Sequence, residues 1–228
     1  MHGTNAVENS PSAFRAAIAA GCGIECDVQQ SSDGAAMVFH DWELDRLTDE
    51  HGPVRLRTVA GLSGVALRGG DPVWTLPRLL AEIGGRVPLL IELKSRRDVP
   101  FEPLCNAVAS ALSGYPGPAA VMSFDPMVVR WFGRNAPGIV RGLVVTEDGR
   151  RGAFAVPRGI LALRFAHAEF IAFDVRDLPS RFAAAMRARD LPVLTWTVSG
   201  AARLATARAF ADALIAEGEG LELARRDA

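Results

Sequence analysis

The feature that most constrains the fold of this chain is a regular alternation of short apolar strands with helical segments. The strands are apolar on both faces, which is typical of parallel strands that are covered by helices. Each strand is separated from the next by a segment whose apolar residues recur at helical spacing. We expect seven strands, at residues 23–28, 89–94, 120–124, 141–145, 171–175, 194–198 and 212–216.

The helices are marked by capping residues and by prolines in their first turns. Ser10-Pro11 predicts the start of the first helix, because serine caps a helix and proline in the first turn loses no hydrogen bond. Residues 35–40 read as a further extended piece, and residues 41–74 as an excursion outside the regular pattern. The expected helices are residues 12–21, 76–85, 101–114, 126–138, 178–190 and 202–211, with another near 159–168.

This alternation predicts either a barrel or a doubly wound sheet. No G-x-G-x-x-G or P-loop sequence follows any strand, which argues against a nucleotide-binding sheet. An eight-stranded barrel takes about 250 residues, so this chain of 228 residues is one strand short. The opening MHGTNAVENS reads as a loop before a capped helix. We therefore expect a TIM (β/α)8 barrel that forms a single domain over residues 1–228 and lacks its first strand.

Charge, hydropathy and cysteine content limit the binding partners and the cellular compartment that can be expected for this chain. The formal net charge of −1 gives no electrostatic attraction to nucleic acid or to an anionic membrane. No apolar run reaches the roughly 18 residues that a membrane span needs, so stable membrane insertion is not expected. Cys22, Cys26 and Cys105 are odd in number and match no metal-binding spacing, which favours a reducing cytoplasm. Nothing in the sequence specifies an oligomeric state.

Acidic residues interrupt two of the apolar strands. Glu25 and Asp27 are two residues apart, so their side chains share one face of a strand. Glu92 and Lys94 repeat this spacing on the next strand. Carboxylates inside a barrel are costly unless a cation meets them. The three acids predict an oxygen-ligand site for Mg²⁺ or Ca²⁺; the alternative is a buried ion-pair network with Lys94.

One histidine stands out beside these strands. His40 ends the extended piece AAMVFH and is followed at once by Asp41. That position places an imidazole at the expected barrel mouth, where it could give or take a proton near neutral pH. Its weight as a candidate comes from the neighbouring acidic strands, because a lone histidine is more often structural.

Several segments carry a family resemblance. GIECDVQQSSDGAAMVFHDWELDRLT contains Glu-x-Asp, a turn ending in Asp-Gly, and His-Asp followed by Leu-Asp-Arg-Leu-Thr. This combination resembles the second-strand signature of the glycerophosphodiester phosphodiesterases, which are phosphodiesterases on a (β/α)8 barrel. Further segments resemble this family as well, and their order and spacing along most of the chain strengthen the resemblance. The other segments that resemble this family are ENSPSAF with AAIAAG, WTLPRLL, LLIELKS, VMSFD and LTWTV.

The resemblance implies an activity and a set of site residues. It implies a phosphoric diester hydrolase that uses one divalent cation, Mg²⁺ or Ca²⁺, to split a small glycerophosphodiester into glycerol 3-phosphate and an alcohol. Such a reaction belongs to lipid and glycerol metabolism. Carried over by position, the resemblance makes Glu25, Asp27 and Glu92 the metal ligands and His40 a catalytic histidine. It also makes Lys94 a phosphate contact and places Trp196 near the substrate, where core packing is the alternative role.

The chain departs from the family's pattern at its start. The family's first strand ends in His-Arg-Gly, whereas this chain has Met1-His2-Gly3 and no arginine. We expect an upstream extension of roughly ten residues that ends in His-Arg-Gly; in the alternative, His2 is itself the first catalytic histidine. Two other functions stay open: a non-catalytic barrel that binds phosphodiesters, and a related barrel phospholipase that acts on whole lipids.

Overall fold

The computed structural model describes residues 6–147 and 155–226. The chain divides into two compact units, residues 1–121 and 122–228, and each is described by itself below. The expectation of a single domain over residues 1–228 stays a prediction. Within the described residues, no helix is both long enough and apolar enough to cross a membrane.

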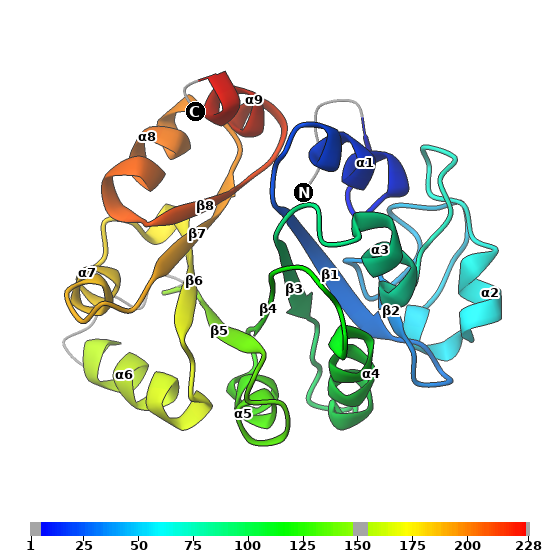
Figure 1. Cartoon of the computed structure of the whole chain (residues 1–228), viewed down its shortest axis with the longest axis horizontal. Coiled ribbons are helices and arrows are strands. Elements are labelled where there is room, and N and C mark those ends of the chain that lie inside the picture. The colour runs from blue at the N-terminus through cyan, green and yellow to red at the C-terminus, as the bar shows by residue number, and fades with distance from the viewer. Residues whose placement is uncertain (1–5, 148–154, 227–228) are drawn as a thin grey trace. The chain divides into compact units, whose positions relative to one another are not determined.

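The first unit is built on a parallel strand pair with an antiparallel neighbour. Strands β1 and β3 pair in parallel, and β2 pairs antiparallel with β1. Helix α3 contacts both α1 and α4 beside these strands (Figure 1). The elements are α1 (Pro11–Ala19), β1 (Ile24–Gln30), β2 (Ala36–Val38), η1 (Val54–Leu56), α2 (Val59–Ser63), α3 (Leu76–Ile83), β3 (Leu89–Leu93) and α4 (Glu102–Leu112). Strand β4 (Ala119–Ser123) contains the boundary between the units.

Local signals explain how the elements of this unit begin and turn. The Ser10 side chain accepts a hydrogen bond from the Ala13 backbone NH at 3.2 Å and so caps α1, as predicted. The Ser31–Gly34 turn joins β1 to β2, and Gly34 supplies the positive φ of 86° that this turn requires. Thr75 caps α3 in the same way as Ser10 caps α1.

The excursion at residues 41–74 is packed against a small core of its own. It contains η1, α2 and isolated bridges, and it contributes no strand of the parallel sheet. Its apolar side chains are buried against the end of β2, which explains why so irregular a segment is ordered. The buried residues of this cluster are Met37, Phe39, Leu44, Leu47, Val54, Leu62, Val65, Leu67 and Val73.

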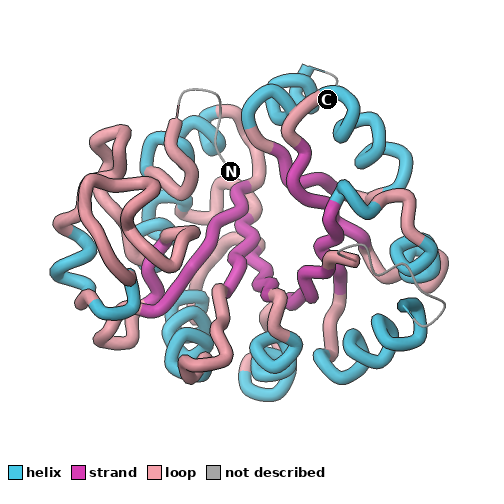
Figure 2. Tube along the Cα trace, turned by 180° about the vertical axis from the view of Figure 1, so that it is seen from behind, coloured by secondary structure: helices cyan, strands magenta, loops and turns pink. Residues whose placement is uncertain are grey.

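The second unit is a run of parallel strands with helices on one side. Strands β5, β6, β7 and β8 pair in that order, all parallel. Helices α5 to α8 lie on the same side of these strands in both views (Figures 1 and 2), whereas a doubly wound sheet carries helices on both faces. The elements are α5 (Pro126–Asn135), β5 (Val140–Val145), α6 (Ala155–Ala166), β6 (Phe170–Asp174), η2 (Val175–Asp177), α7 (Arg181–Arg187), β7 (Val193–Val198), α8 (Ala201–Phe210), β8 (Ala213–Ala216) and α9 (Gly218–Arg226).

All seven predicted strands are present, as β1 and β3 to β8. The sequence analysis did not predict helix α9, which follows the last expected strand. In the structure Leu221 and Leu223 of this helix pack against buried Val198 and Leu204. Tertiary packing of an amphipathic face thus outweighs the low helix propensity of the two glycines.

Gly220 decides how closely α9 approaches strand β7. A Cβ atom at this position would lie 2.2 Å from the carbonyl oxygen of Val198, and that backbone cannot move aside cheaply. We expect Gly220→Ala to lower the free energy of unfolding by about 1–3 kcal/mol through overpacking. Thermal unfolding should show the loss. The control is Gly138→Ala, where no atom of the described residues lies within 4 Å; an equal Tm in both variants would contradict the expected clash.

Candidate active site

Three carboxylates meet where strands β1 and β3 pair. Glu25 and Asp27 share one face of β1, and the register sets Asp27 opposite Glu92 of β3. One carboxylate oxygen from each residue lies within 4.8 Å of the others. Asp27 and Glu92 are buried, and Glu25 is partly buried. The structure therefore brings together the three acids that the sequence placed in one site.

Lys94 lies among these carboxylates. Its Nζ is 2.8 Å from Oδ1 of Asp27 and 2.7 Å from Oε1 of Glu92. The ion pairs of the alternative interpretation are thus present, yet one lysine offsets only one of three negative charges. When every carboxyl is ionised, the three acids carry more negative charge than Lys94 offsets, which favours binding of a divalent cation.

The pKa values of the three acids reflect this excess of negative charge. Burial, reinforced by the charge of Asp27, raises the pKa of Glu25 to about 8. Burial also raises the pKa of Glu92, although Lys94 opposes the effect. Burial alone would raise the pKa of Asp27, but Lys94, His40 and the hydrogen bond from Asn9 together outweigh it and hold that pKa below its usual value. Asp27 is therefore the most firmly ionised member of the group.

Asn9 fixes the carboxylate of Asp27 from the segment before α1. Its Nδ2 donates to Oδ2 of Asp27 at 2.9 Å, and its Oδ1 accepts from the Asp27 backbone NH at 3.0 Å. Asn9 is buried and has a positive φ of 54°, a conformation that asparagine tolerates better than most residues. With Lys94 on the other oxygen of Asp27, this side chain has a single orientation.

His40 follows β2 and is held near the same cluster by the backbone. The Phe39 NH donates to the carbonyl of Asp27 at 3.0 Å, and Nε2 of Gln29 donates to the carbonyl of Phe39 at 3.0 Å. Gln29 also donates to the carbonyl of Asp41. The charge of His40 is among the influences that favour the ionised forms of Asp27 and Glu92. The imidazole therefore lies within electrostatic reach of the carboxylates.

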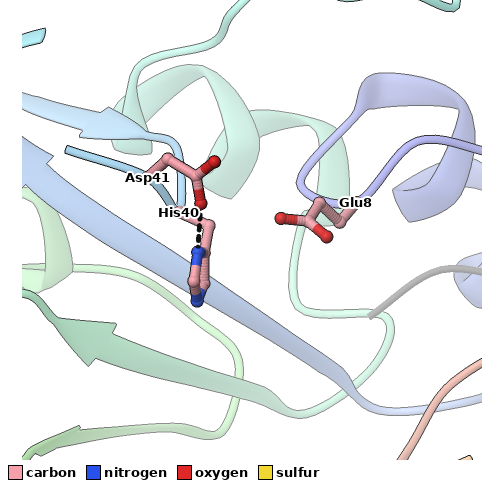
Figure 3. A group of neighbouring side chains, drawn as sticks. All are labelled: Glu8, His40 and Asp41. Carbon is pink, nitrogen blue, oxygen red and sulfur yellow. Dashed lines mark hydrogen bonds and ion pairs between the residues drawn. The ribbon is translucent and has the colours of Figure 1, made fainter. Parts of the chain in front are cut away.

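The side chain of His40 has an acidic neighbour. Its Nδ1 lies 2.7 Å from Oδ1 of Asp41, and the carboxylate of Glu8 points toward this pair (Figure 3). Arg46 joins the two acids: its Nε donates to Asp41 at 2.5 Å, and its guanidinium also donates to Glu8. The ion pair of Arg46 with Glu8 therefore connects the segment before α1 with the loop that carries His40.

A pocket opens beside Lys94 at the end of β1. Trp42, Arg55 and Arg96 contribute to its wall, and none of the residues that line it is acidic. The guanidinium of Arg96 lies 5.4 Å from the ring centroid of Trp42 and pairs with Asp98 outside the pocket. Cationic residues with an aromatic wall suit an anionic ligand.

Two further predicted site residues are Trp196 and His2. Trp196 belongs to β7 in the second unit, where its Nε1 donates to the carbonyl of Ala172 at 3.0 Å. Its ring meets that of half-exposed Phe124 edge to face, with centroids 5.6 Å apart. A contact between Trp196 and substrate stays a prediction. His2 lies outside the described residues.

Sequence reasoning missed the residues that support the site. Glu8, Asn9, Gln29 and Arg46 were present in the quoted motifs, but no role was assigned to them. A signal was available for Gln29, which shares the strand face of Glu25 and Asp27. The pairs Asn9–Asp27 and Glu8–Arg46 join residues 18 and 38 positions apart, and no local pattern indicates them.

This arrangement of acids, lysine and histidine lies in a chain that matches a known protein family. A model of the glycerophosphoryl diester phosphodiesterase family matches residues 2–215. The chain belongs to this family. It is therefore a phosphoric diester hydrolase of the class that acts on glycerophosphodiesters, and the resemblance read from the sequence is confirmed. None of the curated proteins matches the chain.

Solved structures of glycerophosphodiester phosphodiesterases share the fold. A phosphodiesterase of Oleispira antarctica, in complex with the product sn-glycerol-3-phosphate, has a TM-score of 0.86 at 21% identity, over 98% of this chain and 93% of that one. The Thermotoga maritima enzyme has a TM-score of 0.80 at 21% identity, over 98% and 93%. One from Agrobacterium tumefaciens has 0.74 at 24% identity, over 97% and 94%. These similarities confirm the predicted TIM-barrel fold class.

Proposed function

We propose that this chain hydrolyses glycerophosphodiesters to glycerol 3-phosphate and an alcohol, with one divalent cation held by Glu25, Asp27 and Glu92. The observation that carries the proposal is the convergence of these three carboxylates within 4.8 Å, in a chain of this family. The Oleispira antarctica relative, which binds sn-glycerol-3-phosphate as its product, supports the choice of product.

The residues present fit a hard divalent cation. Carboxylate oxygens are the ligands that Mg²⁺ and Ca²⁺ prefer, and the three acids carry more negative charge than Lys94 offsets. The bonds from Asn9 fix the orientation of Asp27 before any cation arrives. When bound, the cation would supply charge neutralisation at the phosphoryl oxygens.

The remaining roles fall to residues of this chain. Lys94 would contact the phosphate of the diester, and the acid-free lining of the pocket beside it supports an anionic occupant. His40 would transfer a proton, because its imidazole lies within electrostatic reach of Asp27 and Glu92. The expected location is the cytoplasm, since the three cysteines, all in the described part of the chain, form no disulfide.

The proposal predicts metal-dependent turnover. Hydrolysis of glycerophosphocholine by the 228-residue chain should require added Mg²⁺ or Ca²⁺ and should stop when the chelator EDTA is added in excess. Release of glycerol 3-phosphate, followed with each metal and without metal, is the measurement. Equal turnover in EDTA would contradict the metal requirement. Binding of the diester without hydrolysis under every condition would instead favour the non-catalytic phosphodiester-binding barrel.

A further inference from the structure

We propose that Asp41, clamped by Arg46 and Glu8, is a positioning residue that fixes the imidazole of His40 with Nε2 as its proton-transfer atom. The inference rests on the proposed function, because it takes His40 as the proton-transfer residue. It adds three side chains to which sequence reasoning gave no role.

The contacts leave Asp41 one orientation. Oδ1 of Asp41 faces Nδ1 of His40 at 2.7 Å and accepts from Nη2 of Arg46 at the same distance. Oδ2 accepts from Nε of Arg46 at 2.5 Å, so the guanidinium grips both oxygens. Arg46 is held in turn by Glu8 through two of its nitrogens. A carboxylate bound in this bidentate way cannot rotate without breaking two charge-assisted hydrogen bonds.

Charge decides which nitrogen of His40 carries the proton. The hydrogen bonds from Arg46 hold the pKa of Asp41 below its usual range, so Asp41 is an ionised acceptor. An ionised carboxylate requires Nδ1 of His40 to be the donor. In the neutral imidazole the lone pair is then on Nε2, which is the atom left to accept or release a proton. This is the logic by which a carboxylate orients a catalytic histidine.

A metal site at the same residues is the competing interpretation. Ligand atoms of Glu8, His40 and Asp41 also lie within 4.8 Å of one another. Here, however, the guanidinium of Arg46 already bonds to both carboxylates. All four carboxylate oxygens of Glu8 and Asp41 accept hydrogen bonds from this guanidinium. Arg46 therefore already occupies the oxygens that a metal ion would need.

The clamp is anchored next to the contact that holds Asp27. Glu8 bonds to Arg46, and the adjacent Asn9 bonds to Asp27 through two hydrogen bonds. The dipeptide Glu8-Asn9 before α1 thus contacts both Arg46, which holds Asp41 beside His40, and Asp27 of the carboxylate group. This arrangement explains how a half-exposed imidazole can be held in register with buried carboxylates.

The same loop contains a matched control. Nδ1 of His51 lies 2.9 Å from Oδ1 of Asp45, so it makes the same type of pair. The His51 side chain is 82% exposed. The side chain of Asp45 accepts bonds from His51 and from the Gly52 backbone, and no arginine side chain among the described residues donates to it. Substitutions at the two pairs therefore separate positioning from the general effect of losing a His–Asp contact.

The first test reads the tautomer of His40 directly. The chain has four histidines, so ¹⁵N-histidine NMR spectra can be assigned by single His→Ala variants. At a pH where His40 is neutral, we expect its Nδ1–H tautomer to dominate in the native chain. Asp41→Asn should shift the population toward Nε2–H, and Arg46→Gln should do so in part. Asp45→Asn should change the His51 signals alone.

The second test reads the reaction. Asp41→Asn should lower kcat for glycerophosphocholine by about 10–100-fold, the effect typical of losing a partner that orients a functional histidine, with little change in KM. Arg46→Gln should lower kcat less, and Arg46→Lys should restore part of the loss because it keeps the charge. Asp45→Asn should match the native chain.

The outcomes separate this proposal from the proposed function. If His40→Ala retains the native kcat, the proton-transfer role is wrong and the positioning role falls with it. If His40→Ala is inactive while Asp41→Asn and Arg46→Gln keep the native kcat and the Nδ1–H tautomer, only the positioning proposal is overturned. A shifted tautomer with a matching fall in kcat, absent from Asp45→Asn, supports it.

Discussion

Replacing His40 with alanine is expected to lower kcat for glycerophosphodiester hydrolysis by about 10²–10⁴-fold, the range for loss of a general acid or base. We expect this loss because the imidazole of His40 is half-exposed, pairs with Asp41 at 2.7 Å and lies within electrostatic reach of Asp27 and Glu92. KM should change little, since the phosphate contact that we assign to Lys94 is untouched. Steady-state kinetics with glycerophosphocholine in saturating metal is the measurement.

The control for this prediction is His51→Ala. His51 also pairs with an aspartate, Asp45, but its side chain is 82% exposed and belongs to no group of acids that we assign to the reaction. We expect it to keep the native kcat. Near-native kcat in His40→Ala would rule out proton transfer by His40, whatever the behaviour of His51→Ala.

The second large effect is expected at the carboxylate group. Glu92→Gln should weaken binding of Mg²⁺ and Ca²⁺ by at least about 100-fold, because even a partner outside the ligand shell is typically worth 10–100-fold. Activity at moderate metal concentration should fall with it. Calorimetric titration of each metal is the measurement. Glu82→Gln is the control, because Glu82 pairs with Arg15 away from this group.

Glu25→Gln should separate metal binding from stability. In EDTA this variant should unfold at a higher temperature than the native chain, since burial and the charge of Asp27 make an ionised carboxyl at Glu25 unfavourable in the folded chain. In saturating metal the order should reverse. The native chain gains about 2.7 kcal/mol when the metal is at 100 times its Kd, and the variant loses this gain. Native-like metal affinity in both Glu92→Gln and Glu25→Gln would refute the ligand set.

The order of elements was determined by the sequence. The helix start at Ser10-Pro11 and the turn Ser31–Gly34 depend on contacts within a few residues, so both can be recognised without the rest of the fold. The alternation of strands and helices is equally local, and the predicted strands are all present. The period of two also put Glu25 and Asp27 on one face of β1.

The resemblance added the family and the roles, and the family is now established. It could assign Glu92 to the same site as Asp27, but their opposition depends on the register of β1 against β3. Arg46 and Glu8 belong to segments that resemble the family, but the resemblance assigned no role to either residue. The assignment of His40, Lys94 and the metal ligands stays a prediction that the experiments above address.

What only the tertiary structure decided are the contacts between distant segments. The bonds from Asn9 to Asp27 and the clamp of Glu8 on Arg46 each join residues whose partners no local pattern indicates. Helix α9 forms for the same reason, because its apolar face packs on Val198 and Leu204. Strand and helix periods are properties of neighbouring residues, whereas side-chain pairs across 18 or 38 positions depend on how the folded segments meet.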